Sequence, residues 1–249
     1  MTDPNRLLAE ANADVYPVLG ACPRPRLPDG WNDAAWRRVP SLCIDKFRPE
    51  SSAHRPRTRV KMVADKQRIY GLFQVEDRYI RSVHTEFQSP VYRDSCVEFF
   101  VQPRPDKGYF NFEFNCGGAF LATYILDPTR TPDGFRDYRP LTPAEGRLIR
   151  VRSCMPATVD PEMTEACTWD LAFQFPVHLL ARYAGPLIIQ EGEVWRANFY
   201  KCGDETSHPH WAAWQPVDEL NFHLPDCFGR LRFGALGKDG ERQDPLNPC

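Results

Sequence analysis

Aromatic residues that alternate strictly with polar ones limit what this chain can fold into more than any other feature. The clearest case is YFNFEFNC (109–116), where Phe occupies every second position and Asn111, Glu113 and Asn115 stand between. A period of two residues places successive side chains on opposite faces of a β-strand. The segment is therefore predicted to be a strand with an aromatic face toward a core and a polar face turned away from it.

The same pattern recurs elsewhere along the chain. In SCVEFFVQ (95–102) an acid, Glu98, lies mid-strand and opposite the apolar face. In EVWRANFY (193–200) the polar face carries Arg196 and Asn198. These strands share an apolar inner face and an outer face of acids, amides and arginine, which is an unusual mixture for a merely solvated sheet surface.

Further strand-like segments, bounded mostly by Gly, Pro, Asn or Asp, lie near 58–64, 68–75, 119–125, 147–153, 168–175 and 229–234. The one clear helix signal is FPVHLLARY (175–183), in which Pro176 suits the first helical position. The chain also has 24 prolines, which weigh against a helical bundle. Together these features predict an all-β fold, a β-sandwich with one or two short helices.

A single domain is predicted to span residues 1–249, because β-sandwiches of this length are ordinary. Within it, 1–30 is Pro-rich and is predicted to be an irregular N-terminal strap, and 237–249 a polar tail. Residues 126–145 carry prolines and glycines without periodicity, so they are predicted to form a long loop.

Charge and cysteine usage exclude several classes of partner. The formal net charge is −2 and no basic stripe occurs, which argues against nucleic acid and against a membrane surface. The nine cysteines are odd in number and contain no CxxC pair, so they are interpreted as reduced thiols. With no secretory signal readable in the chain, this interpretation favours the cytoplasm, and export is the alternative if a signal has been removed.

The outer faces of the strands suit a sugar. Carboxylates accept two hydrogen bonds from adjacent hydroxyls, and amides both donate and accept. Aromatic residues in nearby loops, Tyr92, Trp211 and Trp214, offer surfaces on which the apolar face of a pyranose ring can stack.

Other interpretations of the same residues remain open. Glu98 and Glu113 also match the acid pair of a glycoside hydrolase. The segment CGDETSHPH (202–210) brings Cys202 close in sequence to two histidines, His208 and His210, a spacing that zinc can use. A haem site would need a Met and a His as partners, and no such pairing is marked. A sandwich that binds a protein partner and no sugar is the remaining alternative.

The order of several motifs resembles that of the family-nine carbohydrate-binding modules and their free-standing bacterial relatives, which are similar in fold to DOMON-type sandwiches. The similarity runs through most of 31–234 and is carried by WNDAAW, IYGLFQVED, VYRDSCVEFFVQP, YFNFEFNCGG, GEVWRANFYKCG and HWAAWQPVDELNFHLPDCFGRLRFG. The resemblance implies an antiparallel jelly-roll-like β-sandwich. It also implies non-catalytic binding of a mono- or disaccharide, held in some members at the reducing end of a plant polysaccharide fragment.

The resemblance further implies which residues bind. Tyr92 stands where one aromatic wall is expected, and Trp211 or Trp214 where the second is expected. Glu98 matches a hydroxyl-binding acid. The remaining implied contacts are Glu113 and Asn115, a polar pair in which Glu113 replaces the expected Arg, and Arg196 and Asn198 on the floor of the site.

Members of this family are often attached to glycoside hydrolases in polysaccharide catabolism, so an accessory role beside such an enzyme is a further alternative. No cofactor is expected. Structural calcium is compatible with the resemblance, although no calcium-loop spacing is readable in the chain.

Overall fold

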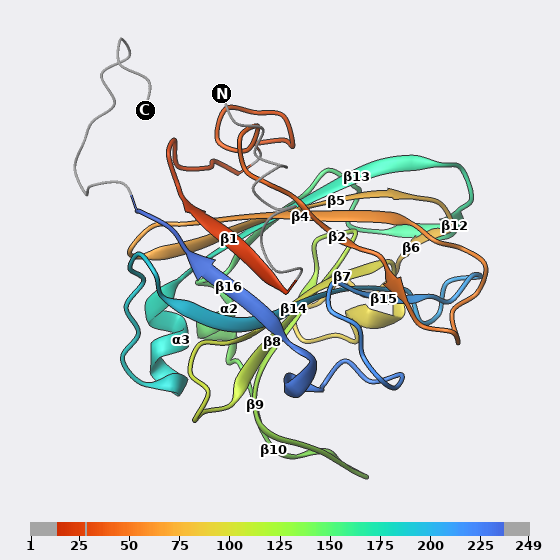
Figure 1. The fold of residues 1–249 in the computed structure, drawn as a ribbon. Coiled ribbons are helices and arrows are strands. Elements are labelled where there is room, and N and C mark those ends of the chain that lie inside the picture. The colour runs from red at the N-terminus through yellow and green to blue at the C-terminus, as the bar shows by residue number, and fades with distance from the viewer. Residues whose placement is uncertain (1–13, 28, 237–249) are drawn as a thin grey trace.

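Two β-layers packed face to face form the body of the protein in this computed structural model (Figure 1). The structure describes residues 14–27 and 29–236. The strands are β1 (Val15–Gly20), β2 (Leu42–Ile44), β3 (Lys46–Phe47), β4 (Arg57–Ala64), β5 (Arg68–Asp77), β6 (Ile80–Ser82), β7 (Cys96–Gln102), β8 (Tyr109–Asn115), β9 (Phe120–Thr131), β10 (Gly134–Pro140), β11 (Arg150–Ser153), β12 (Val159–Met163), β13 (Cys167–Pro176), β14 (Val194–Cys202), β15 (Trp211–Ala213) and β16 (Gly229–Phe233). The helical elements are η1 (Val91–Arg93), α2 (Pro143–Gly146), α3 (Val177–Ala184) and η2 (Pro225–Cys227).

The strand order confirms the predicted β-sandwich. One layer runs β10-β9-β8-β7-β14-β16 and the other runs β4-β5-β13-β11. Strand β1 joins the two layers, because it pairs in parallel with β16 on one side and with β4 on the other. The remaining pairings among the described strands, such as β7 with β8 and β4 with β5, are antiparallel.

Residues 15–20, which fell within the strap predicted for 1–30, therefore form a strand that closes the sandwich. The rest of the strap as far as residue 13, together with residue 28 and the predicted tail 237–249, lies outside the described residues.

The core between the layers is aromatic, as the alternation predicted. Phe99 of β7 stacks on Phe199 of the neighbouring β14 with ring centroids 5.0 Å apart, and on Phe173 of the opposite layer at 5.8 Å. Phe112 of β8 meets Phe175 across the same interface at 4.7 Å. Burying such a ring stabilises the fold by about 1.5–3 kcal/mol each, so these contacts fix the layers and hence the strand faces that point outward.

The outer face of this layer is covered as well, which the sequence did not indicate. All residues of β7 and β8 are buried. Phe100 on the outer face packs with Tyr109, Tyr200 and Phe228 in a second, smaller apolar cluster beneath the segment 214–228. The polar residues of this face are therefore enclosed by protein.

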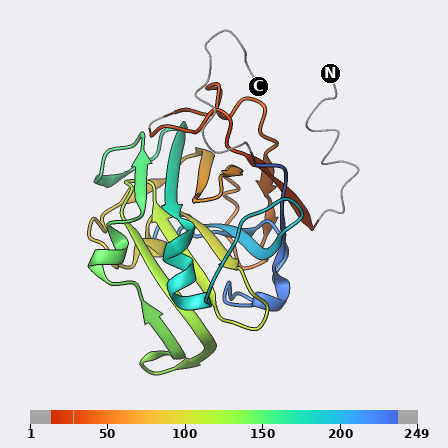
Figure 2. The same ribbon diagram turned by 90° about the vertical axis from the view of Figure 1, so that its left-hand side faces the viewer.

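The prediction of a long loop at 126–145 is wrong. Strand β9 continues to Thr131 and turns at Gly134, whose φ is +123°, into β10. The resulting two-stranded ribbon extends from the body at the bottom of Figures 1 and 2. Most of its residues beyond the body are exposed, so they carry no buried-face alternation by which a strand could be recognised in the sequence.

The predicted helix is confirmed as α3, with Pro176 at its N-cap. A second short helix, α2, follows the ribbon and begins with a capping box in which Thr142 and Glu145 satisfy each other's backbone N–H groups. None of the helices among the described residues has the length and apolarity needed to cross a membrane.

Candidate functional site

A cavity of about 670 Å³ opens on the outer face of β7, β8 and β14. Its floor comes from these strands, and its sides come from η1, β15, the β9–β10 ribbon and the segment 219–223. The lining residues are Tyr92, Glu98, Asn111, Glu113, Leu121, Arg130, Phe135, Cys202, Asp204, Trp211, Glu219, Leu220, Asn221, Phe222 and His223.

Strand register brings two acids together on the floor of this pocket. Glu98 of β7 lies directly opposite Glu113 of β8, and on its other side it faces Tyr200 of β14. Residues paired in this way in an antiparallel sheet share a face and have Cβ atoms about 4.5–5.5 Å apart. Both acids are buried, with 3% and 5% of their surfaces exposed. If both acids were ionised, their charges would repel each other strongly at this spacing in a buried site.

Burial is the main cause of the unusual acidity of this pair. It raises the pKa of Glu113 to about 7. Burial, followed by the nearby Cys202 thiol and Glu113, raises the pKa of Glu98 well above its ordinary value. The pair therefore keeps a proton at pH values where exposed glutamates are ionised.

The floor has more hydrogen-bond acceptors than donors. Asn111 Nδ2 donates to Glu113 Oε1 at 2.7 Å, and the Cys202 thiol donates to Glu98 Oε1 at 3.1 Å. Two acceptor atoms, Asn111 Oδ1 and Glu113 Oε2, have no hydrogen-bond partner among the described residues. A buried acceptor left unsatisfied costs about 1–3 kcal/mol, so a donor-bearing ligand would relieve this cost. We refer to Glu98, Asn111, Glu113 and Cys202 as the pocket floor.

Aromatic side chains stand above the pocket floor. Tyr92 comes from η1 and Trp211 from β15, and both are only partly buried. The indole Nε1 of Trp211 donates to Asp204 Oδ1 at 2.7 Å, which fixes the orientation of that ring. Phe222 lines the pocket and stacks on Tyr200 with centroids 4.1 Å apart. The pocket thus offers flat apolar surfaces beside a polar floor.

The predicted site residues divide into two groups. Four of them, Tyr92, Glu98, Glu113 and Trp211, line the pocket. The other four, Asn115, Arg196, Asn198 and Trp214, lie outside its lining and make contacts within the fold.

The two amides outside the pocket tie loops to strands. Asn115 Nδ2 donates to His84 O at 2.7 Å and to Asp94 Oδ2 at 2.9 Å. Asn198 Nδ2 donates to Gln215 O at 3.0 Å, and its Oδ1 accepts from the Gln215 backbone N–H at 2.9 Å. With both ends of their amides engaged, these residues hold the walls of the site in place.

Arg196 and Trp214 also make their contacts outside the pocket. Arg196 donates to Asp226 O at 3.2 Å, beside η2. Trp214 is buried with its ring 5.9 Å from that of Phe199 and lies over Gly229, where an added Cβ would come within 2.7 Å of the indole. Of the two tryptophans weighed as the second wall, only Trp211 faces the pocket.

Several lining residues could not be singled out from the sequence. Asn111 shares the outer face of β8, and alternation identified that face but not its role. Arg130 and Phe135 come from the ribbon that the sequence presented as a loop. Asp204 and His223 lie in loops without any periodic signal.

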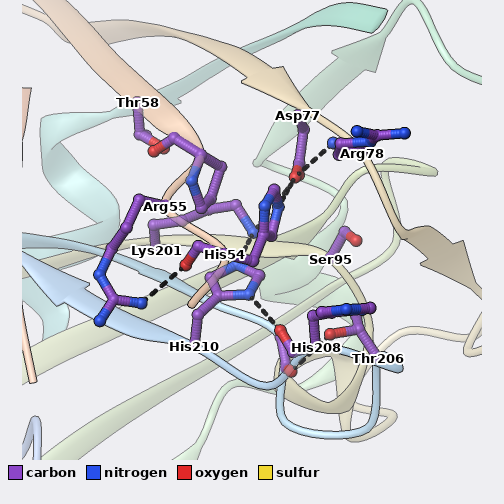
Figure 3. Close-up of polar contacts among 12 residues, drawn as sticks. His54, Arg55, Thr58, Asp77, Arg78, Ser95, Lys201, Thr206, His208 and His210 are labelled. Atoms are coloured by element: carbon purple, nitrogen blue, oxygen red, sulfur yellow. Dashed lines mark hydrogen bonds and ion pairs between the residues drawn. The ribbon is translucent and has the colours of Figure 1, made fainter. Parts of the chain in front are cut away.

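A second polar cluster lies between the layers, on the opposite face of β14 (Figure 3). Lys201 is fully buried and donates to Cys202 O at 2.9 Å and to His210 Nε2 at 2.7 Å, and its Nζ lies 3.6 Å from Asp77 Oδ2. His54 Nε2 contacts the other carboxylate oxygen of Asp77 at 2.8 Å. We refer to His54, Asp77, Lys201 and His210 as the inner cluster.

The zinc site weighed for Cys202, His208 and His210 is not formed. Neighbouring residues on a strand face opposite ways, so Cys202 points to the pocket while Lys201 and its partner His210 lie between the layers. His208 stacks on Tyr79 with ring centroids 3.7 Å apart.

Within the described residues, one group of three metal-binding side chains comes together, Cys96, Glu98 and Cys202, with ligand atoms within 4.8 Å of one another. Two sulfur donors do not fit calcium, which takes oxygen ligands. They suit zinc better, which binds the thiolate form. Burial raises the pKa of the Cys96 thiol to about 12, so in the metal-free protein the group is a cluster of two thiols and one acid.

The pocket floor also does not fit the acid pair of a glycoside hydrolase. Such enzymes need one protonated acid and one ionised carboxylate, set apart by different surroundings. Here burial raises the pKa of both Glu98 and Glu113, and the charge of Glu113 further raises that of Glu98. Burial outweighs the hydrogen bond from Asn111, which lowers the pKa of Glu113, so the pKa values of the two acids are shifted in the same direction.

Comparison with known proteins places the sequence in a family. The sequence model of carbohydrate-binding family 9 matches residues 34–233. No curated protein matches the chain.

Solved structures share the fold. A candidate carbohydrate-binding protein from Bacteroides uniformis ATCC 8492 has 24% identity and a TM-score of 0.76, over 88% of this chain and 99% of its own. A family 9 carbohydrate-binding module from Caldicellulosiruptor kristjanssonii in complex with glucose has 13% identity and a TM-score of 0.59, over 93% and 100%. A family 9 module from the same organism in complex with cellotriose has 14% identity and a TM-score of 0.57, over 94% and 100%.

Proposed function

This chain belongs to carbohydrate-binding family 9, and from that premise we propose that it holds its sugar in the pocket on the outer face of β7, β8 and β14. Carbohydrate binding is its function. In the proposed complex one pyranose ring lies between Tyr92 and Trp211, and its hydroxyls meet Glu98, Glu113 and Asn111.

One observation carries this assignment. Buried acceptors without partners, Glu113 Oε2 and Asn111 Oδ1, lie in the same cavity as two partly exposed aromatic rings. A sugar supplies hydroxyl donors for the first and an apolar ring face for the second. The volume, about 670 Å³, falls within the range of roughly 300–1,000 Å³ usual for small-molecule sites, which accommodates a mono- or disaccharide.

Isothermal titration calorimetry against a panel of mono- and disaccharides tests the assignment. We expect micromolar affinity, because the polar floor must be desolvated before it binds. Replacing Tyr92 with alanine should weaken binding by roughly tenfold or more, since stacking of a ring on an aromatic side chain contributes about 1–3 kcal/mol. Tyr138→Ala is the matched control, because Tyr138 lies on the ribbon and outside the pocket lining.

Glu98→Gln tests the floor separately from the wall. It keeps the shape of the side chain and alters its hydrogen bonding, so we expect weaker binding. Because burial raises the pKa of Glu98, the variant should melt at pH 7 no earlier than the wild type. If binding survives both Tyr92→Ala and Glu98→Gln, the sugar lies elsewhere on the protein.

A further inference from the structure

The side-chain donors around the pocket floor are already engaged. The amide N–H of Asn111 goes to Glu113, and the Cys202 thiol goes to Glu98. Higher up, the indole N–H of Trp211 is also committed. What the floor leaves for a ligand are acceptors, the Glu113 Oε2 and Asn111 Oδ1 atoms, on residues that are at least nine-tenths buried.

Charge in the pocket is strongly one-sided. Its lining holds four carboxylates and a single guanidinium, Glu98, Glu113, Asp204 and Glu219 against Arg130. Arg130 is exposed on the ribbon, where its guanidinium lies 4.1 Å from the centre of the Phe135 ring. Among the described residues no cation lies within salt-bridge distance of Glu98, Glu113 or Asp204.

Other cations near the pocket are committed to partners of their own. Arg81 and Arg93 reach Glu205 at 3.3 and 3.4 Å. Lys201 points away from the pocket into the inner cluster. The protein therefore places two buried acids opposite each other with no cation of the described residues in salt-bridge contact. Burial raises the pKa of Glu113 and outweighs the charge of Arg130, which lowers it.

A neutral hydroxyl satisfies the ionised acid pair poorly, because it brings one donor together with acceptor lone pairs that face carboxylates. An ammonium group brings three donors, no acceptor and a positive charge. We propose that the sugar bound in this pocket is an amino sugar, with its ammonium group held between Glu98 and Glu113. This inference rests on the proposed function, since it names the class of sugar for the same site.

The acidity of the pair is consistent with that ligand. Burial raises the pKa of both acids in the free protein, so the pair carries a proton when the pocket is empty. An arriving ammonium favours the ionised pair, and the displaced proton leaves for solvent. Binding of the amino sugar is therefore coupled to proton release, whereas binding of a neutral sugar is not.

Calorimetry on the full chain at pH 6 tests the proposal with paired ligands. Each 2-amino or 6-amino hexose is compared with the neutral hexose of the same configuration, and glucosamine also with N-acetylglucosamine. Hydrogen bonds to a charged group contribute about 1.5–3 kcal/mol, so at least one amino hexose should bind about 10- to 100-fold more tightly than its neutral partner. Titrations in two buffers of different ionisation enthalpy should show proton release with the amino sugar alone.

The outcomes separate the two proposals. Equal or tighter binding of every neutral hexose overturns the amino-sugar proposal and leaves the sugar pocket intact. Absence of binding by every sugar overturns both. A preference for the amino sugar without proton release also contradicts the proposal, because it places the ammonium group away from the acid pair.

Glu113→Gln provides a matched variant, since it keeps the size of the side chain and removes one charge. Because Glu113 lines the proposed site, we expect weaker binding of both sugars, with the ratio of amino-sugar to neutral-hexose affinity falling most of the way to one. An undiminished advantage in this variant would overturn the assignment to Glu113. The comparison of amino and neutral hexoses on the wild-type protein tests the amino-sugar proposal even if the variant does not fold.

Discussion

Two groups of buried polar residues flank the same strand, and they are satisfied to very different degrees. In the inner cluster, Lys201 makes two hydrogen bonds and an ion pair, which engages all three of its donors (Figure 3). On the pocket floor, one face away, Glu113 and Asn111 keep acceptors without partners. The inner cluster is satisfied within the fold, whereas the pocket floor keeps the acceptors that we propose a sugar occupies.

The two groups also respond to pH in opposite directions. Asp77 and His210 of the inner cluster have folded pKa values of about 2 and about 3, below their ordinary values. Their contribution to stability is present at neutral pH and is lost as the pH falls. The raised pKa of Glu113 has the reverse effect, since its contribution is present in acid and is lost as the pH rises toward 7.

The largest expected effect comes from breaking the inner cluster. Replacing Lys201 with methionine leaves Asp77 buried without its cation, and removal of one partner from a buried pair costs about 3–5 kcal/mol. Chemical denaturation at pH 7 should show this loss. Lys107→Met is the control, because Lys107 is exposed and its nearest acid is 4.0 Å away. A loss as small as that of the control would mean that Lys201 and Asp77 do not stabilise the fold.

Removing a charge from the pocket floor should increase the free energy of unfolding instead of lowering it. The folded pKa of Glu113 is about 7 and the ordinary value is 4.5, so ionising this group costs stability progressively between these pH values. Glu113→Gln should therefore raise the free energy of unfolding at pH 8 by up to about 3 kcal/mol, and by almost nothing at pH 4.

Denaturation curves of both proteins at the two pH values measure this difference. A variant that is destabilised at pH 8 would show that the carboxylate of Glu113 is well solvated or paired in the free protein.

Acid should weaken the inner cluster through His210. Burial, followed by the nearby charge of Lys201, lowers the pKa of this histidine to about 3, from 6.5. Below pH 6.5 the unfolded chain therefore binds a proton at His210 that the folded protein does not bind. By pH 5 this difference lowers the free energy of unfolding by about 2 kcal/mol. His210→Gln should reduce the loss of stability between pH 7 and pH 5, whereas His178→Gln, at an exposed position of α3, should not. Identical pH profiles for the two variants would contradict the buried neutral state of His210.

Alternation predicted the fold and half of the proposed site, for a physical reason. A strand that buries one face must repeat every two residues, so Glu98 and Glu113 could be placed on one outer face from the sequence alone. Alternation cannot show what covers that face. Asn115 and Asn198 share it with the two acids, yet loop backbone atoms occupy their amides.

The pocket-lining residues that the sequence did not indicate lie in segments where buried and exposed positions do not alternate. Asp204 and His223 sit in loops, and their places depend on long-range contacts such as that of His223 with Tyr109 at 2.9 Å. The β9–β10 ribbon is exposed on most of its surface, so nothing in its sequence marked it as a strand. Contacts of this kind are set by the whole fold and not by local periodicity.

The smallest expected effect concerns that ribbon. Phe135 lies at the edge of the pocket, 4.5 Å from the ring of His223, and is only partly buried. Replacing Phe135 with alanine should weaken sugar binding by about fivefold, which corresponds to about 1 kcal/mol for an aromatic contact at the rim. It should lower the free energy of unfolding only modestly, because Phe135 is partly buried where it packs against the apolar cluster around Phe100. Tyr138→Ala, on the same strand and outside the pocket lining, should change neither. If calorimetry finds that both variants bind like the wild type, the ribbon is not a wall of the site, and the ligand contacts only the floor and the Tyr92 and Trp211 side.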